Sequence, residues 1–291
     1  MSDESIVSEE ENTKQRDPKE EAFRNALHQR KVIAESLKNG TLSCLPTTDG
    51  YADTQPAVNL VNGTYYHGAN LLYLKEHQKQ NGYPTAEYVS SSQIDKANEN
   101  NPALYIRKGE KGISIYVSNK NEETGEYEEK NIRLFNVAQT SKPWEMKEWA
   151  NQKQQEKLQE KLDYLRTQYG SNYQLPESKQ KAPGPDIKCT SSEPAQYLGQ
   201  YFAAVSMGSR FQATAEQAAQ FSQKMEEAMF KKIGVSQKTG EPVSNPFELS
   251  KISNEASRYC KNFIKDIRME VQKAEQPQQK HEQQQSKSRN F

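Results

Sequence analysis

Three cationic side chains lie close together around a glycine-containing turn in the middle of the chain. Arg107, Lys108 and Lys111 fall within the five residues Arg107–Lys111, which also include Gly109. Glycines in such a turn let backbone N–H groups approach an anion closely. The residue types and their spacing therefore predict a site for the phosphates of a nucleic acid.

Tyrosines flank the same turn. Tyr105 and Tyr116 are out of phase with the neighbouring aliphatic residues, so we expect them on the solvent face of the strands that carry them. Cations that follow phosphates, combined with aromatic rings on which unpaired bases stack, are typical of proteins that bind single strands. A second polar and aromatic group precedes residues 68–80, and the predicted DNA-binding residues are Tyr65, Tyr66, Asn70, Tyr105, Arg107, Lys108, Lys111 and Tyr116. A solvated turn with half-buried tyrosines is the alternative interpretation.

Motifs for catalysis, metal binding or cofactor binding are missing from the sequence. The four histidines do not form an H-E-x-x-H pair, and the chain has neither a phosphate-binding G-x-x-x-x-G-K-[ST] loop nor a G-x-S-x-G turn. We therefore predict no catalytic residue, no cofactor and no enzymatic activity. A remnant or accessory of a primase or peptidase is the enzyme hypothesis that remains.

Helices and then strands are expected to position these residues. Apolar residues at three- and four-residue spacing predict a helix that ends at Asn39-Gly40, a second helix over 68–80, and a short third helix capped by Ser91 or Ser92. Three strands of an antiparallel meander should follow, and the residues between the first two helices read as a long loop. The predicted class is α+β. The strands are expected at 103–107, 113–118 and 127–137, and the loop at 41–62.

The last third of the chain reads as a separate small helical module. A polar helix precedes it, and we expect Trp144 and Trp149 to dock that helix on the sheet. The apolar stripe Phe221, Met225, Met229 and Ile233 suits either a bundle core or a docking surface for a protein partner. The predicted organisation is a disordered acidic arm at 1–21, a DNA-binding domain at 22–145, a polar helix and linker at 146–190, the α-helical module at 191–273 and a disordered Gln-rich tail at 274–291.

Composition supports small folded units separated by polar segments. The chain has 291 residues, with 39 Lys+Arg against 39 Asp+Glu, 33% hydrophobic residues and a mean hydropathy of −1.06. A zero net charge excludes a uniformly basic nucleic-acid binder and leaves only a local patch for such binding. Three widely spaced cysteines, an acidic N-terminus and the lack of a long apolar run predict a cytoplasmic protein without a membrane partner.

Five ordered segments give the region from Asn59 to Thr140 a family resemblance. In order, they read NLVNGTYYHGANLL, NGY, YVS followed by Gln93, IRKGEKGISIY and FNVAQT. Their order and spacing resemble the N-terminal single-stranded-DNA-binding domain of the ArdC antirestriction proteins, which also occurs at the front of some conjugative-plasmid primases. The resemblance covers roughly residues 20–142. It implies single-stranded DNA as the partner.

Two departures limit what the resemblance implies. The loop after the first helix lacks the Pro-Trp segment that is common in the family, and the chain lacks the H-E-x-x-H motif of the zincin-like C-terminal half of ArdC. The leading hypothesis is sequence-independent binding of single-stranded DNA in plasmid or mobile-element transfer or antirestriction. The alternative is a protein-interaction adaptor that acts through residues 191–273, with the front domain as a scaffold.

Overall fold

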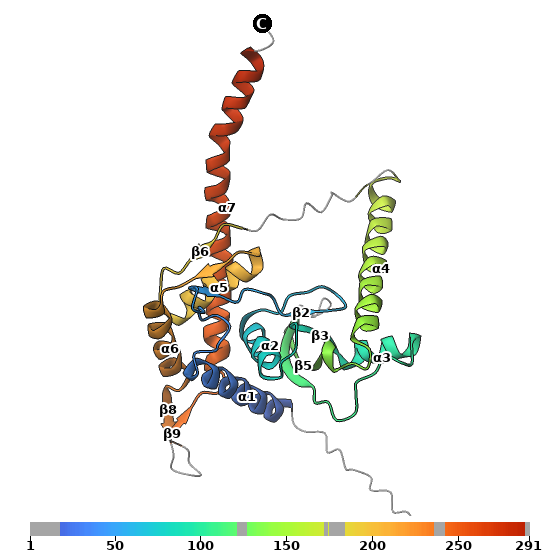
Figure 1. Ribbon diagram of the computed structural model, residues 1–291, viewed down its shortest axis with the longest axis vertical. Coiled ribbons are helices and arrows are strands. Elements are labelled where there is room, and N and C mark those ends of the chain that lie inside the picture. The colour runs from blue at the N-terminus through green and yellow to red at the C-terminus, as the bar shows by residue number, and fades with distance from the viewer. Residues whose placement is uncertain (1–17, 121–126, 172–173, 175–183, 236–241, 289–291) are drawn as a thin grey trace, which may run out of the picture.

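The computed structural model describes residues 18–120, 127–171, 174, 184–235 and 242–288. Seven helices fall within these ranges and are combined with small sheets, which confirms the α+β class (Figure 1). The helices are α1 (Pro18–Lys38), α2 (Gly68–Gln80), α3 (Ser91–Asn100), α4 (Pro143–Tyr169), α5 (Pro194–Met207), α6 (Ala215–Met229) and α7 (Glu248–Ser288), with a 3₁₀ turn η1 (Val137–Gln139).

The main sheet has four strands in the order β2-β3-β5-β4. β4 and β5 form the expected antiparallel hairpin, in which Ile113 pairs with Leu134 and Ile115 with Ile132. β3 continues the sheet antiparallel to β5, whereas β2 runs parallel to β3. The bounds are β2 (Val58–Asn59), β3 (Glu87–Ser90), β4 (Ile113–Lys120) and β5 (Tyr127–Asn136).

The predicted strand at 103–107 was wrong. Only Ile106 pairs there, in a single bridge with Thr140, so the basic turn lies in a loop between that bridge and β4. The capping residue of the third helix was also wrong: Ser90 accepts a hydrogen bond from the backbone of Gln93, whose side chain accepts one from the backbone of Ser90 in return. This reciprocal pair satisfies two N–H groups that the first turn leaves free.

Two smaller sheets connect distant parts of the chain. β1 (Tyr51–Ala52) pairs antiparallel with β7 (Phe211–Gln212), and β6 (Ile187–Lys188) pairs parallel with β7 on its other side. β8 (Lys232–Val235) and β9 (Pro242–Ser244) form a two-stranded ladder. Because β1 and β7 come from the two halves of the sequence, the N-terminal and C-terminal regions share a sheet.

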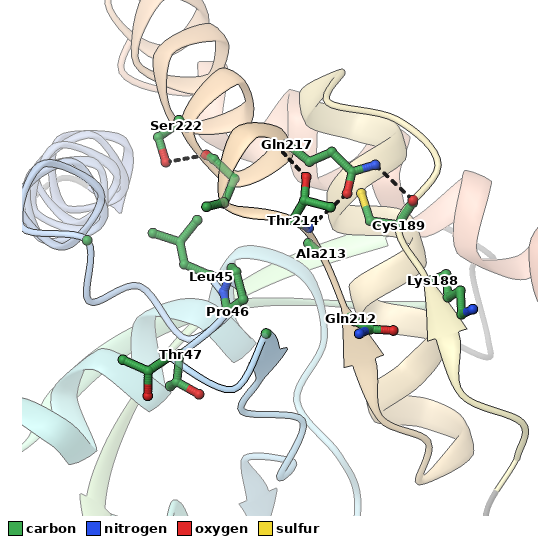
Figure 2. A pocket seen from close by; sticks show the side chains of 16 residues that line it. Leu45, Pro46, Thr47, Lys188, Cys189, Gln212, Ala213, Thr214, Gln217 and Ser222 are labelled. Atoms are coloured by element: carbon green, nitrogen blue, oxygen red, sulfur yellow. Dashed lines mark hydrogen bonds between the residues drawn. The ribbon is translucent and has the colours of Figure 1, made fainter.

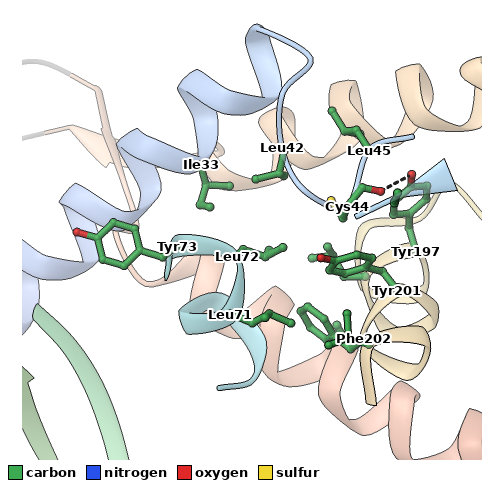
Figure 3. Close-up of a cluster of buried hydrophobic side chains, with 14 of the residues drawn as sticks. Ile33, Leu42, Cys44, Leu45, Leu71, Leu72, Tyr73, Tyr197, Tyr201 and Phe202 are labelled. Carbon is green, nitrogen blue, oxygen red and sulfur yellow. Dashed lines mark hydrogen bonds between the residues drawn. The ribbon is translucent and has the colours of Figure 1, made fainter. Parts of the chain in front are cut away.

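The predicted separate helical module is likewise corrected, because its buried side chains belong to the same hydrophobic cluster as those of α1 and α2. Figure 3 shows Leu71 and Leu72 of α2 facing Tyr201 and Phe202 of α5. Tyr197 donates a hydrogen bond to the backbone oxygen of Cys44 at 3.0 Å. The apolar faces of both regions are therefore buried against each other, while the domain boundaries stay a prediction.

Most of the predicted apolar stripe on α6 is core. Phe221, Met225 and Met229 are completely buried, and Phe221 stacks on Tyr197 with ring centroids 4.0 Å apart. The side chain of Ile233 lies outside those described. The described part of the stripe is thus not a docking surface in this structure.

The long connection at 41–62 is also part of the folded core. Leu42, Cys44 and Ala57 are buried in it. Two charged residues of α2 hold it in place: Glu76 accepts hydrogen bonds from the backbone N–H and hydroxyl of Ser43, and Lys75 lies beyond the loop's Asp53 at 2.9 Å. These contacts supply polar partners that allow a loop to be buried.

Both termini are more helical than expected. Residues 18–21 of the predicted acidic arm belong to α1, and residues 274–288 of the predicted tail continue α7. Abundant Gln, Glu and Lys favour such a continuation because these residues are good helix formers. Residues 1–17 and 289–291, predicted as disordered, lie outside the described residues. None of the described helices is both long enough and apolar enough to span a membrane.

Candidate nucleic-acid interface

The loop at 107–112, which we call the basic loop, connects the Ile106–Thr140 bridge to β4. Gly109 adopts a φ of +89° in it, a backbone conformation that glycine tolerates and other residues rarely adopt. Gly112 is tightly packed, since a Cβ there would lie 2.8 Å from Arg133 Cγ and 2.9 Å from the backbone oxygen of Leu134. Both glycines are therefore needed for the path of the loop.

Arg107 is engaged within the basic loop. Its Nε and Nη2 atoms donate to Glu110 Oε1 at 3.2 and 2.6 Å. Gln139 donates to the other carboxylate oxygen of Glu110 and to the backbone oxygen of Lys111, both at 3.0 Å. The hydrogen bonds from Arg107 and then Gln139 lower the pKa of Glu110. Arg107 thus braces the loop, and its contact with phosphate stays a prediction.

Lys108 and Lys111 are the available cations of the basic loop. Both residues are exposed. Across the ranges that the structure describes, neither ammonium group has a hydrogen bond or an ion pair. A phosphate would therefore meet two uncompensated charges here.

Two exposed aromatic rings lie next to this loop. Tyr105 is 52% exposed, and its backbone N–H and C=O bond to Ser141 Oγ and N–H at 3.1 and 2.8 Å. Trp144 is 73% exposed, and its indole N–H donates to Glu148 at 2.9 Å. The expectation that Trp144 docks α4 on the sheet was wrong, because Met146 and Ala150 form the buried side of that helix. Trp149, by contrast, packs partly buried against the second cluster.

Trp144 is a candidate stacking residue that the sequence interpretation missed. Pro143 at the start of α4 places Trp144 in the first helical turn. Trp144 is two residues from Met146, about 200° around a helix, so it points away from the buried side. This periodicity could have revealed its exposure.

The other predicted residues line a polar groove between the main sheet and α7. Tyr65, Tyr66, Asn70 and Tyr116 all contribute to it, and its volume is about 980 Å³. Tyr65 is 43% exposed, whereas burial raises the pKa of Tyr66 to about 12 against a hydrogen bond from Asn59. Tyr66 is therefore neutral at physiological pH and less accessible for stacking than Tyr65.

Asn70 and Asn59 organise the walls of this groove. Asn70 donates to the backbone oxygen of Tyr116 at 2.7 Å and accepts from Gln29 at 3.3 Å. Asn59 accepts from the backbone N–H groups of residues 61 and 62 and exchanges hydrogen bonds with Gln93 at 3.0 and 3.3 Å. Asn59 and Gln93 belong to the recognised motifs, but only the fold shows that they contact each other.

The predicted residues therefore fall into two groups, with Arg133 between them. Arg133 lines the groove, pairs with Ser114 in the hairpin and packs against Gly112 at the end of the basic loop. Its guanidinium has no partner in the described portion of the chain. Sequence interpretation missed Arg133, because its position depends on the register between β4 and β5.

A second cavity, of about 810 Å³, lies away from all of these residues (Figure 2). It lies between the 40–50 segment, β6, β7 and the first turns of α6, and Thr214 and Gln217 close a capping box at its edge. Ala213, Ala218 and Leu45 make much of its wall apolar. It contains none of the predicted DNA-binding residues.

The described residues include no cluster of three or more His, Cys, Asp or Glu side chains that could hold a metal ion. The three cysteines are buried and unpaired, and burial raises the pKa of Cys260 to about 11. The prediction of no cofactor stays untested.

Fold and surface together define an α+β protein with a cationic loop beside exposed aromatic rings. Residues 28–170 match the family model described as the N-terminal domain of anti-restriction factor ArdC, and this segment of the chain is an ArdC N-terminal domain. The recognised family was therefore correct.

Two further comparisons were made. The crystal structure of the antirestriction ArdC protein from the R388 plasmid, in its metal-free form, is similar to 83% of this chain and 97% of that chain, with 16% identity and a TM-score of 0.46. A search of curated proteins gave no match.

Proposed function

We propose that this protein binds single-stranded DNA through the basic loop and its neighbouring aromatic rings, in an anti-restriction role related to plasmid or mobile-element transfer. The observation that carries the proposal is the juxtaposition of Lys108 and Lys111, both unpaired, with the exposed Tyr105 in an ArdC N-terminal domain. Lysines attract phosphates without sequence preference, and a ring adds about 1–3 kcal/mol for each stacked base.

Binding should be electrostatic and should leave the strand chemically unchanged. The part of the chain that carries these charges has zero net charge overall as a protein, so the attraction is local to the basic loop. In the conjugative setting, a protein covering the unpaired strand would shield it from nucleases that act on DNA. A labelled strand should therefore be recovered intact after incubation with the protein and Mg²⁺.

The test is fluorescence anisotropy of a labelled strand of roughly 30 nucleotides at two salt concentrations, with the matching duplex as competitor. Lys108→Ala plus Lys111→Ala should weaken binding by about 2 kcal/mol, taking about 1 kcal/mol per exposed ion pair, which is a roughly 30-fold rise in Kd. The slope of log K against log salt should fall by about 1.4, since each neutralised phosphate contributes about 0.7.

A matched control removes two lysines of similar spacing on the exposed side of α4. Lys157 and Lys161 are exposed and belong to the part of α4 that stands away from the rest of the chain in Figure 1. Lys157→Ala plus Lys161→Ala should leave Kd and the salt slope unchanged. Equal weakening by both double variants would show that only total charge matters, and binding unaffected by the loop variant would refute the proposal.

A further inference from the structure

The second wall of the polar groove comes from α7, outside the segment that matches the ArdC N-terminal domain. Four α7 side chains line the groove at positions i, i+3, i+4 and i+7, which place them on one face of a helix. Asn254 is exposed there, and Ser250 and Ser257 are half-buried. The lining residues of α7 are Ser250, Ser253, Asn254 and Ser257.

Close packing holds this wall in position. Gly68 at the start of α2 has a φ of +62°, and a Cβ there would collide with the hydroxyl of Ser253. On its other side α7 lies against α5, where a Cβ at Gly199 would lie 2.6 Å from the ring of Tyr259 and 2.9 Å from the backbone oxygen of Ala256. Since both contacts are at backbone distance, the groove has a defined width.

The groove is lined by neutral hydrogen-bonding groups rather than by charges. Amides, hydroxyls and tyrosine rings make up its polar lining, and none of the described residues in it carries a carboxylate. Burial, assisted by Lys261, lowers the pKa of His67, which keeps this imidazole neutral near pH 7. Arg133 is the one guanidinium among the described lining residues, and it lies at the end next to the basic loop.

This lining suits the bases of a strand better than its phosphates. Base edges offer donors and acceptors to amides and hydroxyls, and base faces stack on tyrosine. Phosphates need cations, which are concentrated on the basic loop and at Arg133. In a duplex the pairing edges are occupied, so only an unpaired strand can place its bases in the groove.

Resting on the proposed function, we propose that the groove between the main sheet and α7 takes the unpaired bases of the bound strand, with Asn254 and Ser257 of α7 as its second wall. The phosphates then follow Arg133 toward Lys111 and Lys108. The C-terminal region thereby becomes part of the DNA site instead of a separate adaptor.

The test narrows the groove and compares the result with the same change elsewhere on α7. Asn254→Trp should raise Kd for a 30-nucleotide strand by about tenfold, corresponding to the loss of about one stacked base, and should leave the salt slope unchanged because no phosphate contact is lost. Asn262→Trp is the control: Asn262 is exposed on the same helix, outside the groove lining, and its variant should bind normally.

An abasic strand of equal length separates base contacts from backbone contacts. Wild-type protein and Asn254→Trp should bind this probe equally, since it offers phosphates without bases. If the tryptophan variant does not fold, as judged by circular dichroism, Asn254→Ala plus Ser257→Ala should still weaken binding of the normal strand about threefold or more, through the loss of hydrogen bonds.

The outcomes distinguish this inference from the proposed function. If the loop variant loses binding while both Asn254 variants bind like wild type, the groove proposal is refuted and the basic loop remains the site. If the loop variant binds normally, the proposed function itself fails. A loss that is equal for Asn254→Trp and Asn262→Trp would also overturn the groove, because it would reflect a general disturbance of α7.

Discussion

A buried ion pair between α2 and the 41–62 connection gives a quantitative prediction about the fold. The side chain of Lys75 is completely buried, and its ammonium group contacts Asp53 at 2.9 Å and the backbone oxygen of Gln55 at 2.5 Å. Removing one partner of a buried pair costs about 3–5 kcal/mol, because the other charge is left uncompensated. Since the Asp53 side chain is 37% exposed, we expect Asp53→Ala to cost about 3 kcal/mol.

Removing the lysine charge should cost less. Lys75→Met leaves Asp53 free to contact water, and methionine fills most of the buried space, so we expect a loss of about 1–2 kcal/mol. The double variant should be as stable as Lys75→Met alone, which gives an interaction energy of about 3 kcal/mol in a double-mutant cycle. Urea unfolding at pH 7 followed by circular dichroism measures each free energy of unfolding.

The pH dependence provides an independent check of the same ion pair. Burial lowers the pKa of Lys75 below 10.5, and Asp53 opposes that shift. Between the lowered pKa and 10.5 the unfolded chain binds more protons than the folded chain, so this residue makes stability rise with pH. Loss of Asp53 widens that window downward, so the penalty of Asp53→Ala should be smaller at pH 10 than at pH 7.

The control is an exposed ion pair on α1. Lys31 and Glu35 are 3.9 Å apart with both side chains more than half exposed, and Glu35→Ala should change stability by less than about 0.5 kcal/mol. An Asp53→Ala variant as stable as this control would refute the reasoning. So would a double variant whose loss equals the sum of the two single losses.

Two more predictions concern a buried histidine and an exposed tryptophan. Burial, followed by the charge of His28, lowers the pKa of His77 from 6.5 to about 4, so the unfolded chain binds the extra proton and stability should fall as pH drops through that window, by up to about 3 kcal/mol at 1.36 kcal/mol per pKa unit. His77→Gln should lose correspondingly less between pH 7 and pH 4, and parallel urea curves for the two proteins would contradict this. Trp144→Ala should raise Kd for single-stranded DNA about tenfold without changing the free energy of unfolding, since the ring is mostly exposed; Tyr164→Ala, at a site 64% exposed farther along α4, is the control and should have no effect.

Local patterns were sufficient for the elements that depend on neighbours in the chain. Residues 68–80 form a helix with the predicted bounds, and the alternation of Ile113, Ile115 and Val117 marks β4 correctly. The capping box that begins at Thr214 is present as well. These features follow from side-chain periodicity and local hydrogen bonds, which act over a few residues.

Features that depend on a partner far away in the sequence could not be obtained in this way. The 103–107 segment alternates like a strand, yet it has only Thr140 as a partner, and register between strands is not contained in either strand alone. The same limit hid Arg133, whose place beside Gly112 follows from the β4–β5 pairing.

The sequence by itself determined the chemistry of the candidate site: a cationic loop, its glycines and the tyrosines around it. Only the tertiary structure decided which charges are free, since Glu110 engages Arg107 and leaves Lys108 and Lys111 unpaired. It also decided that the C-terminal helices join the same core and that α7 completes the groove. The physical reason is that burial of apolar surface is non-directional, so an apolar helix face does not specify which partner covers it.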